Sequence, residues 1–274
     1  MRKLGIIAGS GSLPKRIADT YANRGGTVFV IALEGITDPK TTWDRDHAWV
    51  KLGRIQGAMD AMIAAEVEDV VMAGPIKRPA LSSLDLDGRG AKLIFRAGRK
   101  VFGDDGLLST IVAEIESDGF RVIGIDQILA GTLAPSGRVA GPEPDGVAQA
   151  DIKRGVEVLQ SLGPVDVGQS IAVQEGLVLA VEAVEGTDAM ISRAGALMRQ
   201  GPAPVLIKMT KLGQERRADM PAVGPETIRH AAAAGFRGIA MEAGSTLLLE
   251  SDEVCRLADE AGFFVVGVNV LGPV

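Results

Sequence analysis

Many side chains that could bind a ligand or take part in catalysis lie between residues 205 and 230. The sequence of this segment is VLIKMTKLGQERRADMPAVGPETIRH. An apolar strand at 205–207 leads into a loop that holds cations and carboxylates, namely Lys208, Lys211, Arg216, Arg217, Glu215 and Asp219. Lysine and arginine donate charged hydrogen bonds to phosphate oxygens, and carboxylates hold hard cations such as Mg²⁺. The loop therefore predicts a binding site for a polyanion with its metal, and a solvated charged loop is the alternative.

The position of this loop favours a binding site. In open α/β sheets, ligands bind beyond the carboxyl ends of the strands, and the loop lies there if the strand at 205–207 is parallel to its neighbours. Gln214 belongs to the same loop. Two prolines, Pro221 and Pro225, restrict the backbone after the charged residues, and a helix is expected to begin near the second of them.

The composition limits what this loop can serve. The chain has 274 residues, which allows two domains of about 130 residues each, and 46% of its residues are hydrophobic. A net charge of -6 argues against general nucleic-acid binding, which needs a basic surface. Cys255 is the only cysteine, so neither an intramolecular disulfide nor a thiolate metal cage is expected. The longest apolar runs have the length of strands, so we predict no membrane span and a cytoplasmic protein.

The chain opens with a strand, a glycine-rich turn and a helix. Strand 3–8 and helix 15–24 are expected on either side of Gly9, Ser10, Gly11, Ser12, Leu13 and Pro14. Glycines let a ligand approach the backbone, and a helix N-terminus presents free N–H groups to phosphate. Glu34 ends a second strand at 27–33, where a dinucleotide fold has its ribose acid, but Pro14 replaces the third glycine of that fingerprint. The turn predicts a nucleotide site, with an NAD site or a purely structural turn as alternatives.

Three further segments of the first half carry charge where a ligand could meet it. A strand at 69–74 leads into Ile76 and Lys77, within a proline-bounded tip that faces phosphate or is a plain surface loop. Asp104 and Asp105 precede a helix over 107–115 and are expected to cap it or to bind metal. The helix at 89–101 places five cations beside an apolar stripe, which predicts contact with anionic lipid or a solvated face.

The second half has a different strand pattern. Strands at 169–173 and 177–183 around a Glu175-Gly176 turn predict an antiparallel hairpin, and Thr187 or Asp188 is expected to cap the following helix. A strand at 121–125 closes the first half. The predicted fold class is α/β with two domains. We expect an N-terminal Rossmann-like parallel sheet in 1–135, a linker at 136–147 and a C-terminal α/β domain with a mixed sheet in 148–274.

Five segments together resemble a known family. They are GIIAGSGSLP at 5–14, GDDGLLS at 103–109, GLVLAVEAVEGTDAMI at 176–191, QERRADMPAVGPETI at 214–228 and GIAMEAGSTLLLE at 238–250. They are similar to the metal-dependent UDP-2,3-diacylglucosamine diphosphatase family of lipid A biosynthesis, of the LpxI type. The resemblance implies a two-domain hydrolase that splits UDP-2,3-diacylglucosamine into UMP and 2,3-diacylglucosamine 1-phosphate. It also implies peripheral contact with the inner membrane, and it leaves the oligomeric state open, a homo-oligomer included.

The residues and the resemblance converge on attack of water on a diphosphate. The charged oxygens of a diphosphate repel nucleophiles, so cations must neutralise them and a carboxylate or metal must position water. We predict Mg²⁺ or Mn²⁺ as the cofactor, with Asp219 as the main ligand and Asp188, Asp104 and Asp105 as the next candidates. The predicted catalytic residues are Asp219, Asp188, Lys208 and Lys211. The predicted substrate-binding residues are Gly9, Ser10, Gly11, Ser12, Leu13, Ile76, Lys77, Thr187, Gln214 and Arg217.

The chain departs from the family pattern at two positions of the charged loop. A proline and an aspartate of that pattern are replaced by Leu212 and Glu215, whereas Asp219 keeps its place. Glu215 is therefore left out of the predicted ligands. Two other functions remain open: an NAD or sugar-nucleotide binder without diphosphatase activity, in which the second half dimerises, and a sugar-nucleotide transferase that uses an acceptor other than water.

Overall fold

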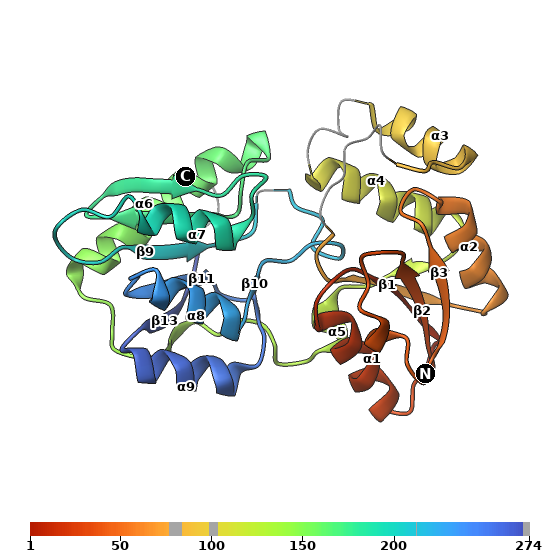
Figure 1. The fold of residues 1–274 in the computed structure, drawn as a ribbon, viewed down its shortest axis with the longest axis horizontal. Coiled ribbons are helices and arrows are strands. Elements are labelled where there is room, and N and C mark those ends of the chain that lie inside the picture. Colours follow the sequence, from red (N-terminus) through yellow and green to blue (C-terminus); the bar gives the residue numbers. More distant parts are fainter. Residues whose placement is uncertain (77–83, 99–103, 212, 271–274) are drawn as a thin grey trace. The chain divides into compact units, whose positions relative to one another are not determined.

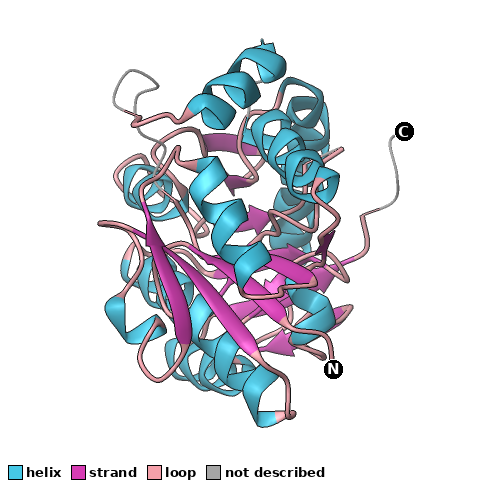
Figure 2. Ribbon diagram, turned by 90° about the vertical axis from the view of Figure 1, so that its right-hand side faces the viewer, coloured by secondary structure: helices cyan, strands magenta, loops and turns pink. Residues whose placement is uncertain are grey.

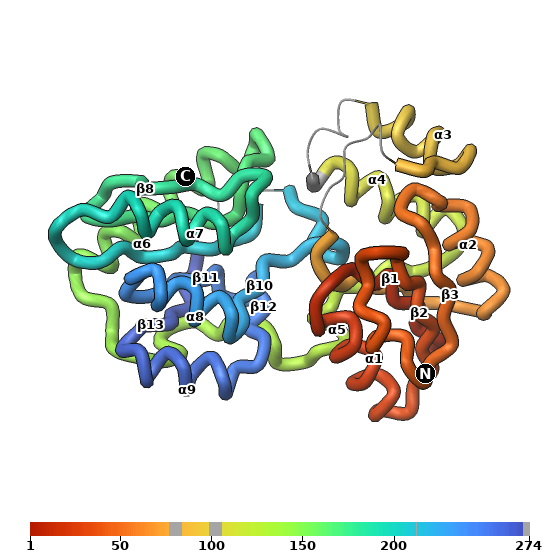
Figure 3. Tube along the Cα trace, viewed as in Figure 1, coloured from red at the N-terminus to blue at the C-terminus, as the bar shows by residue number. Residues whose placement is uncertain are grey.

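The computed structural model describes residues 1–76, 84–98, 104–211 and 213–270. The chain folds into two compact units (Figure 1). The N-terminal unit consists of residues 1–130 together with 215–219, and the C-terminal unit consists of residues 131–214 and 220–274. Residues 215–219 therefore belong to the first unit, although the residues on both sides of them belong to the second (Figure 3).

Five parallel strands form the sheet of the N-terminal unit in the order β3, β2, β1, β4, β5. The strands are β1 (Leu4–Ala8), β2 (Val28–Leu33), β3 (Asp46–Val50), β4 (Asp69–Ala73) and β5 (Arg121–Val122). The helices are α1 (Leu13–Asn23), α2 (Ile55–Ala64), α3 (Gly88–Ala97), α4 (Asp104–Ser117) and α5 (Ile125–Ile128). This is the strand order of a doubly wound nucleotide-binding half, and the predicted Rossmann-like parallel sheet is confirmed.

Helices cover both faces of this sheet (Figure 2). Met59 and Met62 of α2 and Ile115 of α4 pack on one face, against Ile31 and Val70. Helix α1 contacts β1 and β2 and also α5. All six residues of β2 are buried, as expected for a parallel strand that is covered on both sides.

The end of the first half differs from the prediction. A strand was expected over 121–125, but β5 ends at Val122 and α5 begins at Ile125. Strand β3 was not predicted at all, because two of its five residues are only half-buried and the other three are exposed, as suits the edge of a sheet.

A six-stranded mixed sheet forms the C-terminal unit in the order β6, β13, β11, β9, β7, β8. The strands are β6 (Gly137–Ala140), β7 (Ser170–Gln174), β8 (Leu177–Val181), β9 (Val205–Lys208), β11 (Gly238–Glu242) and β13 (Phe264–Val268). A second sheet pairs β10 (Ala222–Val223) with β12 (Leu247–Leu248). Strands β9, β11 and β13 are parallel, and β6, β7 and β8 are antiparallel to their neighbours, so the predicted mixed sheet is confirmed.

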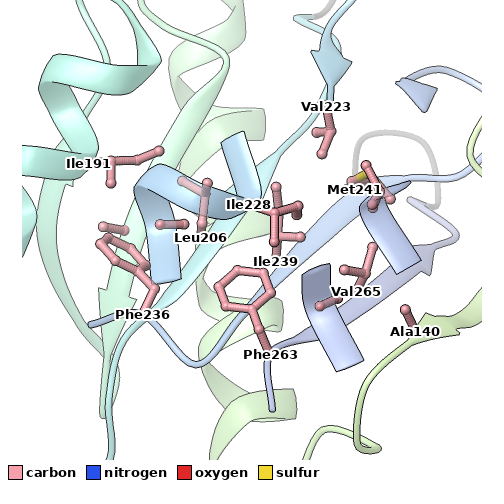
Figure 4. Packing of buried hydrophobic residues seen from close by; sticks show 14 of the residues in the cluster. Ala140, Ile191, Leu206, Val223, Ile228, Phe236, Ile239, Met241, Phe263 and Val265 are labelled. Atoms are coloured by element: carbon pink, nitrogen blue, oxygen red, sulfur yellow. The ribbon is translucent and has the colours of Figure 1, made fainter. Parts of the chain in front are cut away.

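The helices of this unit are α6 (Gly146–Leu162), α7 (Thr187–Gly195), α8 (Pro225–Ala233) and α9 (Ser251–Ala261). Ile191 of α7 and Ile228 of α8 pack with Leu206, Ile239 and Val265 in one core (Figure 4). Helix α6 covers the opposite face, where Ile152 and Leu159 belong to a second core. The central strands β7, β9, β11 and β13 are thus buried on both sides, whereas the outer strands β6 and β8 are partly exposed.

Two segments of the C-terminal unit have structure that local patterns did not predict. Strand β6 lies within the expected linker at 136–147 and pairs with β13. The carboxylate of Asp151 in α6 is buried and accepts hydrogen bonds from Glu175 N at 3.1 Å and Gly176 N at 2.7 Å. Both turn residues have positive φ, so Asp151 stabilises the tight turn of the predicted hairpin.

Candidate functional site

The glycine-rich turn follows β1 at the point where the strand order of the N-terminal sheet reverses. Gly9 N donates to Ala73 O at 2.7 Å, and Ser10 donates to Pro75 O through its backbone N at 2.9 Å and its Oγ at 2.8 Å. The turns after β1 and β4 are thereby joined. Parallel α/β sheets bind ligands at this reversal, so the turn has the position of a nucleotide site.

The first turn of α1 presents backbone donors at this position. Ser12 is the N-cap residue and makes no capping bond with its side chain, and the first turn contains no acidic residue. Gly11 is exposed with φ of 81°, and Ile76 is 40% exposed on the neighbouring turn. Lys77 lies outside the described residues. A helix start without an acid attracts phosphate through its free N–H groups and its dipole.

Gly9 should tolerate no side chain. A Cβ atom at Gly9 would lie 2.2 Å from Gly74 O, a backbone atom that cannot move away without opening the joined turns. We expect Gly9→Ala to lower the free energy of unfolding by about 1–3 kcal/mol, the usual range for overpacking, and to weaken nucleotide binding. Gly88→Ala is the control, because a Cβ there meets nothing within 4 Å. Thermal unfolding of the two variants with and without UMP tests this, and equal melting temperatures would contradict it.

Lys208 lies in strand β9 and not in the loop where it was expected. It pairs with Ser170 and Met241 in the sheet and is 6% exposed. Its Nζ donates to Thr187 Oγ1 at 2.8 Å, and Thr187 Oγ1 donates to Glu182 Oε1 at 3.0 Å. The strand therefore buries the lysine stem and places the ammonium toward Thr187 at the carboxyl end of β9.

Helix α7 begins differently from the prediction. Gly186, with φ of 83°, is the N-cap residue, so neither Thr187 nor Asp188 caps the helix through its side chain. Asp188 lies in the first turn, 65% exposed, with its Oδ1 3.2 Å from His230 Nδ1. Both residues line a hollow of about 520 Å³ between α7 and α8. The structure brings Thr187, but not Asp188, into hydrogen-bond contact with Lys208.

Lys211 and Gln214 form a small group at the carboxyl end of β9. Lys211 Nζ is ion-paired with Asp166 Oδ1, and Lys211 N donates to Gln214 Oε1 at 2.8 Å. The Lys211 side chain is 8% exposed. Since β9 is parallel to β11, this group has the position that the sequence predicts for a ligand-binding loop.

Arg217 and Asp219 belong to the N-terminal unit. Arg217 donates to Glu215 through Nε at 2.9 Å and Nη2 at 2.8 Å, and to Glu116 of α4 through Nη1 at 2.7 Å. The Arg217 guanidinium lowers the pKa of Glu215, which therefore stays ionised. Asp219 is half-buried, and its backbone N donates to Glu215 O at 3.0 Å.

The predicted metal ligands are Asp219, Asp188, Asp104 and Asp105. Among the residues that the structure describes, no three His, Cys, Asp or Glu side chains gather in a way that could hold a metal ion. Asp104 and Asp105 begin α4, but their side chains lie outside the described part of the chain. Mg²⁺ is usually bound by one or two carboxylates with waters and substrate phosphates, so single carboxylates such as Asp219 fit a metal that arrives with a diphosphate.

Three acidic residues that make the contacts described above, Glu182, Glu116 and Asp166, were absent from the predicted site residues. Glu182 lies in a segment with several polar residues, so its position in the sequence could have indicated a site. Glu116 and Asp166 gave none, because their partners Arg217 and Lys211 are 101 and 45 residues away in the chain.

Comparison with known proteins identifies the family. The model of the LpxI N-terminal domain matches residues 3–132, and the model of the LpxI C-terminal domain matches residues 135–266. The chain belongs to the LpxI family. A member from Caulobacter vibrioides, UDP-2,3-diacylglucosamine pyrophosphatase LpxI, is 39% identical over 279 residues, which cover 98% of each chain. The LpxI resemblance of the sequence motifs is thereby confirmed.

Among solved structures, CobK precorrin-6A reductase matches this LpxI chain with a TM-score of 0.34 and 11% identity. The match covers all of this chain and 90% of that one. A score this low supports no inference about the LpxI fold or its ligands.

Proposed function

We propose that this protein hydrolyses the diphosphate bond of UDP-2,3-diacylglucosamine to UMP and 2,3-diacylglucosamine 1-phosphate, a step of lipid A biosynthesis. The observation that carries the proposal is the 39% identity over 98% of both chains to a UDP-2,3-diacylglucosamine pyrophosphatase. An alignment without a missing domain supports the same substrate and the same bond, because both units of the fold are present in both proteins.

The described side chains support roles in this reaction. The turn at 9–13 offers backbone N–H groups for the nucleotide end, and the Lys208 ammonium offers charge to the diphosphate. Water attacks one phosphorus, the bridging P–O bond breaks, and the charge that develops on the leaving phosphate oxygen is met by the cations. Asp219 orients the attacking water or holds its metal. A bound Mg²⁺ would polarise the phosphoryl oxygens.

Product analysis tests the proposed function. The protein is incubated with UDP-2,3-diacylglucosamine and Mg²⁺, and the products are measured by mass spectrometry. We expect UMP and 2,3-diacylglucosamine 1-phosphate in equal amounts. Uncleaved substrate would contradict the proposal, and transfer of the sugar phosphate to another acceptor would indicate a transferase. In addition, UMP with Mg²⁺ should raise the melting temperature and NADH should not. Hydrolysis in oxygen-18 water, followed by a search for the label in each product, identifies the attacked phosphorus.

Contact with a membrane surface is a second part of the proposal, because the substrate carries two acyl chains. No helix in the described part of the chain is long and apolar enough to cross a membrane. Helix α3 was expected to present a row of cations, but Arg89 is drawn inward, 16% exposed and ion-paired with Glu114 and Asp118. Arg99 and Lys100 lie outside the described residues. Arg89 is therefore not one of the outward cations, in contrast to the prediction.

Phe95 is the most notable residue of that face. It is 90% exposed, and Ala91, Lys92 and Arg96 beside it line the same shallow hollow. An aromatic ring between cations suits the interface of an anionic bilayer, where each nearby cation contributes about 1 kcal/mol. We propose that Lys92, Phe95 and Arg96 of a cytoplasmic protein contact such a surface reversibly.

We expect Phe95→Ser to reduce sedimentation with vesicles of anionic phospholipid by about threefold or more at low salt, because the ring contributes most of the apolar contact. Ile63→Ser is the control, since Ile63 is a second exposed apolar residue, 56% exposed, on α2 of the same unit. Equal partitioning of the wild type and Phe95→Ser would remove α3 as the contact surface. Higher salt should release the wild type, because attraction to the anionic surface is screened.

A further inference from the structure

Three donor nitrogens of one arginine hold the charged segment 215–219 in place. Arg217 Nε and Nη2 grip the two carboxylate oxygens of Glu215, and Arg217 Nη1 reaches Glu116 Oε1 at 2.7 Å. An arginine in a two-point contact with one carboxylate presents a rigid plane. The guanidinium therefore links the segment to α4 of the N-terminal unit in a defined orientation.

The segment also has backbone and apolar contacts in that unit. Ala218 N and Asp219 N both donate to Glu215 O, at 2.9 and 3.0 Å, so residues 215–219 form a closed turn. Ala218 packs against the core that contains Val112 and Ile115 of α4. A Cβ atom at Gly124 would lie 3.9 Å from Arg217 Cα, so the turn also lies close to the chain after β5. Asp219 is the last residue of this turn.

We propose that Arg217, Glu116 and Glu215 form a clamp that positions Asp219, and that Arg217 acts as a positioning residue and not as a substrate ligand. The inference rests on the proposed function for the part that concerns catalysis. It also assigns a role to the Glu215 carboxylate, which accepts hydrogen bonds from Arg217 with both of its oxygens. The clamp fixes the Asp219 carboxylate relative to the nucleotide turn, which lies in the same unit.

Glu116→Gln distinguishes the clamp from a substrate-binding arginine, because the two roles predict opposite changes. If Arg217 bound phosphate, removing a competing carboxylate would leave kcat/KM unchanged or raise it. If Arg217 is a clamp, the same change loosens the turn and lowers kcat by about fivefold with little change in KM, the scale of one exposed ion pair. Arg217→Lys should lower kcat further, because lysine keeps the positive charge but cannot donate a bidentate pair of hydrogen bonds to the Glu215 carboxylate.

Hydrogen exchange measures the clamp without reference to catalysis. In Glu116→Gln, the amides of Ala218 and Asp219 should exchange at least about threefold faster, since they open when the turn loosens. Glu260→Gln is the matched control, because it breaks another exposed ion pair with an arginine, Arg256, on α9. Unchanged exchange at residues 218 and 219, or a raised kcat/KM, would overturn the clamp. If the wild type did not cleave the substrate at all, the proposed function would fail, and the exchange result would still decide the clamp.

Discussion

Replacing Asp219 by alanine should lower kcat for UDP-2,3-diacylglucosamine by at least about a hundredfold, which is the scale of one removed acid–base or electrostatic partner. Asp219 is the last residue of a closed turn in which Arg217 makes ion pairs and Ala218 meets the core. Because these contacts remain when the carboxylate is removed, the turn should keep its conformation. We expect a melting temperature within a few degrees of that of the wild type.

Asp219→Asn refines this experiment, because the amide keeps the shape of the side chain and removes its charge. A loss similar to that of the alanine variant would show that the charge is needed. Asp60→Asn is the control, since Asp60 is an exposed acid on α2 that accepts a hydrogen bond from Gln56. Near-normal kcat in Asp219→Asn would contradict a catalytic role of the Asp219 charge and would favour the alternative, a solvated charged loop.

Local patterns predicted the elements whose residues depend on their nearest neighbours. The run from β1 through Gly9 and Gly11 into α1 combines apolar residues, glycines and a first-turn proline, and it forms the expected strand, turn and helix. The hairpin of β7 and β8 was predicted from the Glu175-Gly176 turn in the same way. In both cases a few consecutive residues determine the conformation of the chain.

Distant partners account for what the sequence did not predict. Strand β6 looks like a linker until β13, more than a hundred residues later, provides the neighbour for its backbone. Residues 215–219 follow a strand of the C-terminal unit but find Glu116 and the core of the N-terminal unit. Lys208 was expected in a loop because lysine is rarely buried. Its ammonium donates a hydrogen bond to Thr187, and this bond offsets part of the free energy lost when the ammonium leaves water. None of these contacts can be predicted from the residues that are adjacent to it in the sequence.

The largest expected effect after Asp219→Ala is the loss of activity when divalent metal is removed. Turnover should disappear in excess EDTA and return with Mg²⁺ or Mn²⁺, because oxygen ligands without a cysteine cage favour these ions over zinc. The protein alone should bind Mg²⁺ weakly, since no group of three acids or histidines that could hold a metal exists among the described residues. Calorimetric titration with Mg²⁺ alone and with Mg²⁺ plus UMP measures the difference.

The reason for this dependence lies in the cations of the site. Lys208 donates to Thr187 and Lys211 is paired with Asp166, so part of their charge already serves protein groups. A diphosphate with several negative oxygens then needs further positive charge before water can attack, and a metal carried in with the substrate supplies it. Full activity in excess EDTA would mean that the lysines suffice. In that case Lys208→Met, which removes the ammonium and keeps a similar apolar stem, should abolish the reaction while Asp219→Asn leaves part of it.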